Sequence, residues 1–224
     1  MKHALKVPVM AAIVVVLCSG VALGKAGQDA NPKLTPQVAI AKMKATWDSI
    51  NTYAGTVTVH EAKGNSIQDR VYLVRFEKPT QTRVDIVGGD GRGSVALWNG
   101  GDRVRGHQGG FLSFIKLNVD LHSKFSTDLR GSTIDQANFG ALLAHLKSLN
   151  PKVEHVTTVH GKVVLEIETD PPAPNTDVTK EIYVLAPNWL PLEFYEYAGD
   201  KVVKHVVNSD LKLNGDIPAS TWRL

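Results

Sequence analysis

The chain has 224 residues, a formal net charge of +3 and a single cysteine. One cysteine excludes an internal disulfide and a CxxC redox site. No block of like charges provides the electrostatic footprint of a nucleic-acid binder, so we expect no nucleic-acid partner.

The first 24 residues predict a signal peptide. Lys2 and Lys6 form a basic start, residues 7–17 are almost wholly apolar, and residues 22–24 supply small side chains where a signal peptidase reads them. The apolar run is shorter than the roughly 20 residues of a membrane-spanning helix. A retained N-terminal anchor is the alternative. We expect an exported, periplasmic protein that is cleaved near Gly24.

Cys18 lies within this apolar run and leaves open a lipoprotein, although Leu17 stands where a lipoprotein signal has a small residue. Cleavage at Gly24 would remove the only thiol and lower the net charge by two. About 200 residues then remain, which suit one domain. The expected organisation is a signal peptide (1–24), a flexible leader (25–33) and a single domain (34–224).

A helix is predicted at the start of the domain. Thr35 is a good N-cap, Pro36 suits the first helical position, and apolar residues recur at spacings of three and four as far as about Asn51. After it, the apolar period changes to two, as in strands. Strands are predicted at Tyr53–Glu61, Ile67–Glu77, Thr82–Val87, Ser94–Trp98 and Arg103–His107.

The strand Ile67–Glu77 is apolar on both faces. Val71 and Leu73 point one way, whereas Tyr72, Val74 and Phe76 point the other. Such a strand is covered on both faces or lines a cavity on one of them.

The middle of the chain interrupts the strands. Apolar residues are dense from Phe111 to Leu117, after a Gly109-Gly110 hinge, and a second helix with one apolar stripe is predicted at Asn138–Leu149. These apolar side chains are either plain core or a lid over a hollow sheet. Further strands are predicted at Val153–Val159, Lys162–Glu168, Val178–Leu185, Leu190–Tyr197 and Lys201–Leu213, with a proline-rich loop at Asp170–Asn175.

This pattern predicts an α+β fold that is mainly antiparallel β. Roughly ten strands are many for one flat sheet, so curling into an open or closed barrel is favoured.

The sequence offers little chemistry. The glycine-rich stretch 88–93 leads into a strand, so it is interpreted as a hairpin loop and not as a nucleotide loop. The eight histidines show no HxH or HExxH spacing, and neither GxSxG nor SxxK is present. Glu166, Glu168 and Glu193 occupy solvent-facing strand positions. We therefore expect no metal, no cofactor and no catalysis, with an envelope hydrolase as a minor alternative.

Several stretches resemble the LolA-type lipoprotein-carrier superfamily. They are the leader, the helix ending near residues 47–53, YAGTVTV (53–59), VYLVRFEKPTQTRVDI (71–86), SVALWNGG (94–101) and residues 190–218. The resemblance implies an unclosed, curved antiparallel β-barrel with helices covering its concave side, and a hollow that holds the acyl chains of a lipoprotein. RseB-type regulators share this fold, so a periplasmic sensor or regulatory binding module is the alternative.

In the carriers, an arginine before the proline at the end of the second strand helps to hold the lid shut. Lys78 stands at the matching position, before Pro79. A lysine makes a point contact where arginine offers a planar fork. Lys78 is therefore expected to contact the lid, although less specifically.

We thus predict a periplasmic protein that holds a lipid or an acylated lipoprotein in an apolar cavity. Outer-membrane lipoprotein sorting is the role this suggests, with a membrane-associated donor or acceptor as a further partner. The residues expected to line the cavity are Phe76, Val84, Ile86, Leu97 and Trp98 from the sheet, with Phe111, Phe114, Ile115, Leu142 and Leu146 from the lid.

Overall fold

The computed structural model describes residues 34–149, 153–168 and 176–224. The expectations for the signal peptide, the leader, Cys18 and the proline-rich loop concern residues outside these ranges.

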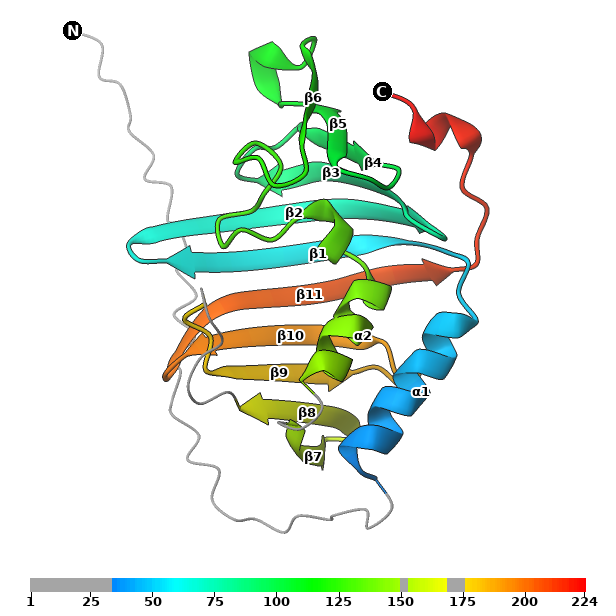
Figure 1. Cartoon of the computed structure of the whole chain (residues 1–224), viewed down its shortest axis with the longest axis vertical. Helices are drawn as coiled ribbons and strands as arrows, with labels where there is room; N and C mark the ends of the chain where they lie inside the picture. Colours follow the sequence, from blue (N-terminus) through cyan, green and yellow to red (C-terminus); the bar gives the residue numbers. More distant parts are fainter. Residues whose placement is uncertain (1–33, 150–152, 169–175) are drawn as a thin grey trace, which may run out of the picture.

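A single antiparallel sheet of eleven strands forms the body of the protein, in the order β6-β5-β4-β3-β2-β1-β11-β10-β9-β8-β7 (Figure 1). The outermost strands β6 and β7 do not pair with each other, so the sheet is not closed. This confirms the predicted unclosed sheet. The strands are β1 (Thr52–Lys63), β2 (Ser66–Glu77), β3 (Gln81–Gly89), β4 (Val95–Trp98), β5 (Arg103–His107), β6 (Lys116–Asp120), β7 (Val153–Val159), β8 (Lys162–Glu168), β9 (Lys180–Leu185), β10 (Pro191–Ala198) and β11 (Lys201–Leu213).

Edge strand β6 was not predicted. It begins inside the apolar segment expected to form a lid, and only Leu117 and Val119 alternate with its polar residues. Between β5 and β6 the chain forms a single 3₁₀ turn, η1 (Gly110–Leu112).

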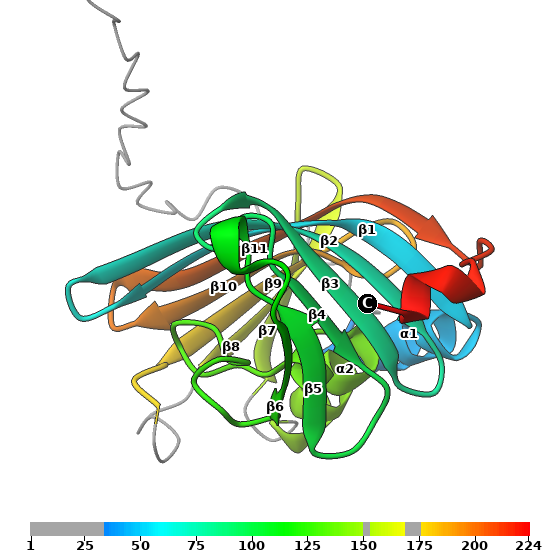
Figure 2. The ribbon, with the colours of Figure 1, turned by 90° about the horizontal axis from the view of Figure 1, so that it is seen from above.

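Two capped helices lie on the concave side of the sheet, which curves around α2 (Figures 1 and 2). The Thr35 side chain accepts from the Val38 amide at the start of α1 (Pro36–Asp48), and the Asn138 side chain accepts from the Ala141 amide at the start of α2 (Phe139–Ser148). Each cap satisfies an amide that has no partner inside the helix. No helix in the described ranges is both long and apolar enough to cross a membrane.

The core fills only part of the concave side. Met43 of α1 and Leu146 of α2 pack on Leu165 and Tyr183, so both helices rest on β8 and β9. At the end of the sheet nearest α1, Tyr53 stacks on Phe76 with ring centroids 5.1 Å apart. Beside this core, inward residues of β1 to β6 line a cavity.

Candidate functional site

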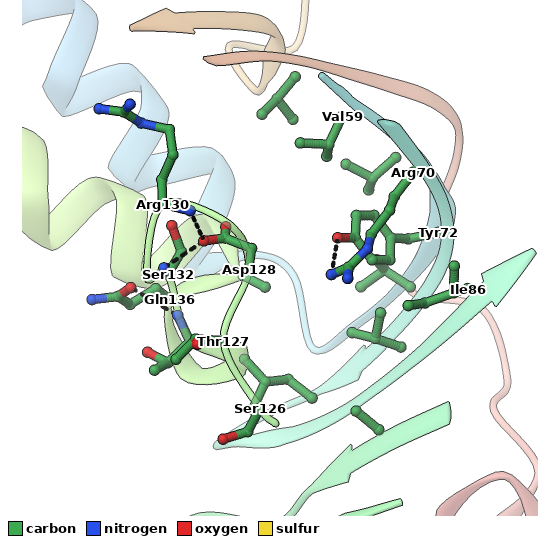
Figure 3. Close-up of a pocket in the computed structure, with 18 of the residues that line it drawn as sticks. Val59, Arg70, Tyr72, Ile86, Ser126, Thr127, Asp128, Arg130, Ser132 and Gln136 are labelled. Carbon is green, nitrogen blue, oxygen red and sulfur yellow. Dashed lines mark hydrogen bonds between the residues drawn. The ribbon is translucent and has the colours of Figure 1, made fainter. Parts of the chain in front are cut away.

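A cavity of about 1400 Å³ lies between the concave face of the sheet and the segment opposite it. Residues 121–133, here called the strap, cross the concave face ahead of the 3₁₀ turn η2 (Ile134–Gln136) and α2. In Figure 3, Ser126 and Thr127 of the strap lie on the opposite side of the hollow from Tyr72 and Ile86 of the sheet. Apolar surface predominates in the lining.

Strand alternation explains which side chains form the wall, because every second residue points to the same face. Val57 and Val59 of β1 point inward, and Val57 lies opposite Tyr72, which in turn lies opposite Ile86. Deeper in the cavity the same face continues across the neighbouring strands. It comprises Val74, Val84, Ala96, Gly106 and Leu117, each opposite the next.

Three of the predicted ligand-binding residues, Val84, Ile86 and Leu142, lie in the cavity wall. That they bind a ligand stays a prediction. Phe76 and Leu146 are on the concave side, but they are 1% and 0% exposed and belong to the packed core beneath the helices.

The structure does not place Leu97 and Trp98 in the wall. Leu97 points to the convex face, as does its cross-strand partner Arg83. Arg83 donates to the backbone of the C-terminal segment. The inward residue of β4 is Ala96. The prediction was therefore one residue out of phase. Trp98 packs beside the cluster of Val104, Leu121 and Ile134 at the end of the strand.

The segment expected to form a lid does not cover the hollow. Phe111, Phe114 and Ile115 are 89%, 71% and 43% exposed and do not line the cavity. The loop that carries them projects beyond the sheet between β5 and β6, because β6 extends the sheet instead of folding over it (Figure 1). The strap takes the place expected for this lid.

Lys78 does reach a helix on the concave side. Its Nζ donates to the backbone oxygens of Trp47 (2.7 Å) and Asp48 (3.3 Å) and lies 4.5 Å from the centre of the Trp47 ring. The last carbonyls of a helix lack intrahelical partners and carry partial negative charge, so a cation here stabilises the end of α1.

We predict that Lys78→Met loosens the end of α1. The loss of two hydrogen bonds from a charged group costs about 1–3 kcal/mol. Faster hydrogen exchange at the Ser49 and Ile50 amides, with unchanged exchange in α2, is the expected result. Unchanged exchange at both amides would show that Lys78 does not hold this helix end.

A row of four charged residues and one glutamine, here called the charged row, lies at the other end of the hollow. Glu181, Glu196, Lys204, Glu61 and Gln68 lie opposite one another across β9, β10, β11, β1 and β2. The next row inward is Tyr183, Phe194, Val206, Val59 and Arg70, mostly apolar. The cavity thus changes from charged to apolar along the strands.

The strap is fastened to this row by buried ion pairs. Lys204, whose side chain is 10% exposed, has its Nζ 2.8 Å from Glu61 Oε1 and 2.9 Å from Asp128 Oδ2. Arg130 donates from Nε to Glu196 (3.2 Å) and from Nη1 to the Ala62 oxygen (2.9 Å), and it also pairs with Asp177. These contacts join the strap to β1, β10 and β11.

Helix α2 is attached to the same row. His145 Nε2 lies 2.9 Å from Glu181 Oε1, and this hydrogen bond raises the pKa of His145. Glu181 also accepts a hydrogen bond of 2.6 Å from the buried Tyr183 hydroxyl.

The buried carboxylates of the row have altered proton affinities. Burial raises the pKa of Glu61 to about 6, against the pull of Lys204. Burial acts the same way on Asp128, but Lys204, Glu61 and the Ser132 amide together hold the pKa of Asp128 below its usual value. Of the two neighbours, Glu61 is the one that takes up a proton first.

We predict that Glu61→Gln changes how stability depends on pH. The pKa of Glu61 in the folded state, about 6, lies above its ordinary value of 4.5. The contribution of Glu61 to the free energy of unfolding is therefore largest below pH 4.5 and is lost as the pH rises through 6. Between pH 4 and pH 7, the free energy of unfolding of Glu61→Gln should therefore rise by about 2 kcal/mol relative to that of the wild type. Urea titrations at several pH values measure this gain, and parallel curves for both proteins would contradict the assignment.

The charged row and the strap were missed as site elements. A signal for the row exists in the sequence, because Glu61 and Lys204 are in phase with the inward Val57, Val59 and Val206. A charge in phase with an apolar strand face lies on the buried side of the sheet, where it needs a partner. The strap has no such periodicity.

The sequence matches no protein-family model, and no curated protein was found to be related to it. Among solved structures, it is similar to a protein of the DUF1329 family from Desulfovibrio piger (11% identity, 84% of this chain and 95% of that chain, TM-score 0.45). It is also similar to a LolA superfamily protein from Nitrosomonas europaea (13% identity, 85% of this chain and 98% of that chain, TM-score 0.42). A third similar structure is a putative outer membrane lipoprotein-sorting protein domain from Vibrio parahaemolyticus (10% identity, 84% of this chain and 97% of that chain, TM-score 0.42). Structures named for the superfamily that the sequence resembles are thus among the matches.

Proposed function

We propose that this protein is an exported, periplasmic binding protein that holds acyl chains of a lipid or a lipoprotein and performs no catalysis. The observation that supports this most is the cavity of about 1400 Å³ with its largely apolar wall. Pockets for drug-sized ligands are roughly 300–1,000 Å³, so this one suits a larger ligand.

Burial of acyl chains supplies enough energy without any specific chemistry. Each buried CH₂ contributes about 0.8 kcal/mol, so a chain of ~16 carbons gives on the order of 10 kcal/mol before the costs of association. The inward faces of β1 to β3 offer Val57, Val59, Val74, Val84 and Ile86 for this burial.

The charged end makes the cavity amphipathic, which fits a ligand with a polar headgroup. Transfer of lipid or lipoprotein between membranes, with a membrane-associated donor or acceptor, is the role that such a carrier would serve. The LolA-type resemblance supports the same role.

Titration with a dansyl-labelled fatty acid tests this proposal on the protein that begins at Lys25. Saturable binding with a blue-shifted emission, displaced by unlabelled palmitate or phosphatidylglycerol, is the expected result. Emission that stays at its value in water, with no saturation, would contradict acyl binding.

A further inference from the structure

The charges that line the cavity are not balanced. Each carboxylate in the lining has a basic partner: Asp128 pairs with Lys204, Asp177 and Glu196 with Arg130, and Glu181 with His145. By contrast, four cations of the lining have no carboxylate of the described ranges within ion-pair distance. These are Lys63, Arg70, Arg92 and Lys124.

Arg70 is the one of these that lies well inside a strand, because Lys63 is the last residue of β1 and Arg92 and Lys124 lie in turns. Its side chain extends from β2 over Tyr72 into the cavity (Figure 3). Nε donates to the Asp90 backbone oxygen (3.1 Å), and Nη1 contacts the Tyr72 hydroxyl at 3.5 Å. A guanidinium has five N–H donors, and no acceptor in the described part of the chain takes the remaining ones. Arg70 is therefore oriented but not satisfied.

Tyr72 adds a second donor at the same place. Its hydroxyl oxygen faces Arg70, and its own proton has no acceptor among the described residues. The side chain is largely buried, and burial raises the pKa of Tyr72, so the hydroxyl keeps its proton. A guanidinium fork beside a phenol hydroxyl matches the oxygens of a phosphate or a carboxylate.

The position of the pair fits the headgroup of an amphiphile. Arg70 lies opposite Val59, and Val57 and Val74 follow it along the apolar wall. Its Nη2 is next to Gly91 in the β3–β4 hairpin, where Arg92 also lines the cavity. An anion bound here would have apolar wall on one side and a further cation on the other.

We propose that Arg70 and Tyr72, with Arg92 nearby, bind the anionic phosphate or carboxylate headgroup of the amphiphile whose chain fills the apolar part of the cavity. This inference rests on the proposed acyl binding and adds the class of headgroup to it. Charged hydrogen bonds from the fork should favour an anionic ligand over a neutral one of equal chain length by about 10-fold or more.

Calorimetric titration with three probes tests the proposal: decyl phosphate, decanol and inorganic phosphate. The wild type should bind decyl phosphate about 10-fold more tightly than decanol. Arg70→Gln should lose most of this preference while its affinity for decanol is unchanged. Arg105→Gln is the matched control, because Arg105 is exposed and does not line this cavity, and it should behave like the wild type.

The outcomes separate the two proposals. Equal affinity for decyl phosphate and decanol, or equal effects of Arg70→Gln and Arg105→Gln, would overturn the headgroup site and leave acyl binding intact. Inorganic phosphate that binds as tightly as decyl phosphate would assign the site to a free anion, which also overturns it. Failure of both decyl ligands to bind would overturn the proposed function itself. If Arg70→Gln does not fold, Tyr72→Phe replaces it as the test variant. It removes one donor and is expected to lower the affinity for decyl phosphate while leaving the affinity for decanol unchanged.

Discussion

Replacing Val84 by glutamate is expected to abolish acyl binding. Val84 lies in the apolar wall between Val74 and Ala96. A carboxylate there would lie against the bound chain and would have to be buried or neutralised, at a cost of several kcal/mol. We predict at least a roughly 100-fold weaker affinity for a dansyl-labelled fatty acid, measured by fluorescence titration.

Val87→Glu is the matched control for this variant. Val87 is on the same strand, is 39% exposed and does not line the cavity. The same substitution should leave the affinity within about two-fold of the wild type, because surface changes are usually small. Equal losses in both variants, or a folded Val84→Glu that still binds, would show that this face is not the wall of the site.

Replacing Lys204 by methionine is expected to destabilise the protein strongly. The Lys204 ammonium lies within 3 Å of Glu61 and Asp128, so its loss leaves two buried carboxylates facing each other. Removal of one partner of a buried ion pair typically costs about 3–5 kcal/mol, or about 10 °C in melting temperature for a domain of this size. Urea and thermal unfolding measure both quantities.

Two further variants show whether the loss comes from the buried network. Lys201→Met removes an exposed charge from the same strand and should change stability by less than about 0.5 kcal/mol. Adding Glu61→Gln to Lys204→Met removes one of the stranded carboxylates and should restore part of the stability. A loss in Lys204→Met no larger than in Lys201→Met would mean that the strap does not depend on this network.

Most of the fold could be predicted from the sequence, because its strands and helices carry strong local signals. The caps Thr35 and Asn138 mark the two helix starts. The predicted bounds of β5, β7, β8 and β11 are the observed ones, and the number of strands indicated a curved sheet. Edge strand β6 was missed because it has only two inward apolar residues and follows a denser apolar stretch.

The site was less predictable, because it depends on which face of each strand is concave and on contacts between distant residues. Val84 and Ile86 were placed on the inward face, whereas Leu97 was one residue out of phase. High apolar density at Phe111 to Ile115 does not imply burial, and these side chains are exposed. The attachment of the strap joins Asp128 to Lys204, 76 residues away, and no local pattern reports such a pairing.

Native mass spectrometry tests the central claim most directly. The protein that begins at Lys25 would be incubated with a bacterial lipid extract, freed of unbound lipid and measured intact. We predict added mass equal to a phospholipid or an acylated peptide, retained in Val87→Glu and lost in Val84→Glu. A protein that stays empty at every lipid concentration, and also excludes the fluorescent fatty acid, would contradict the account.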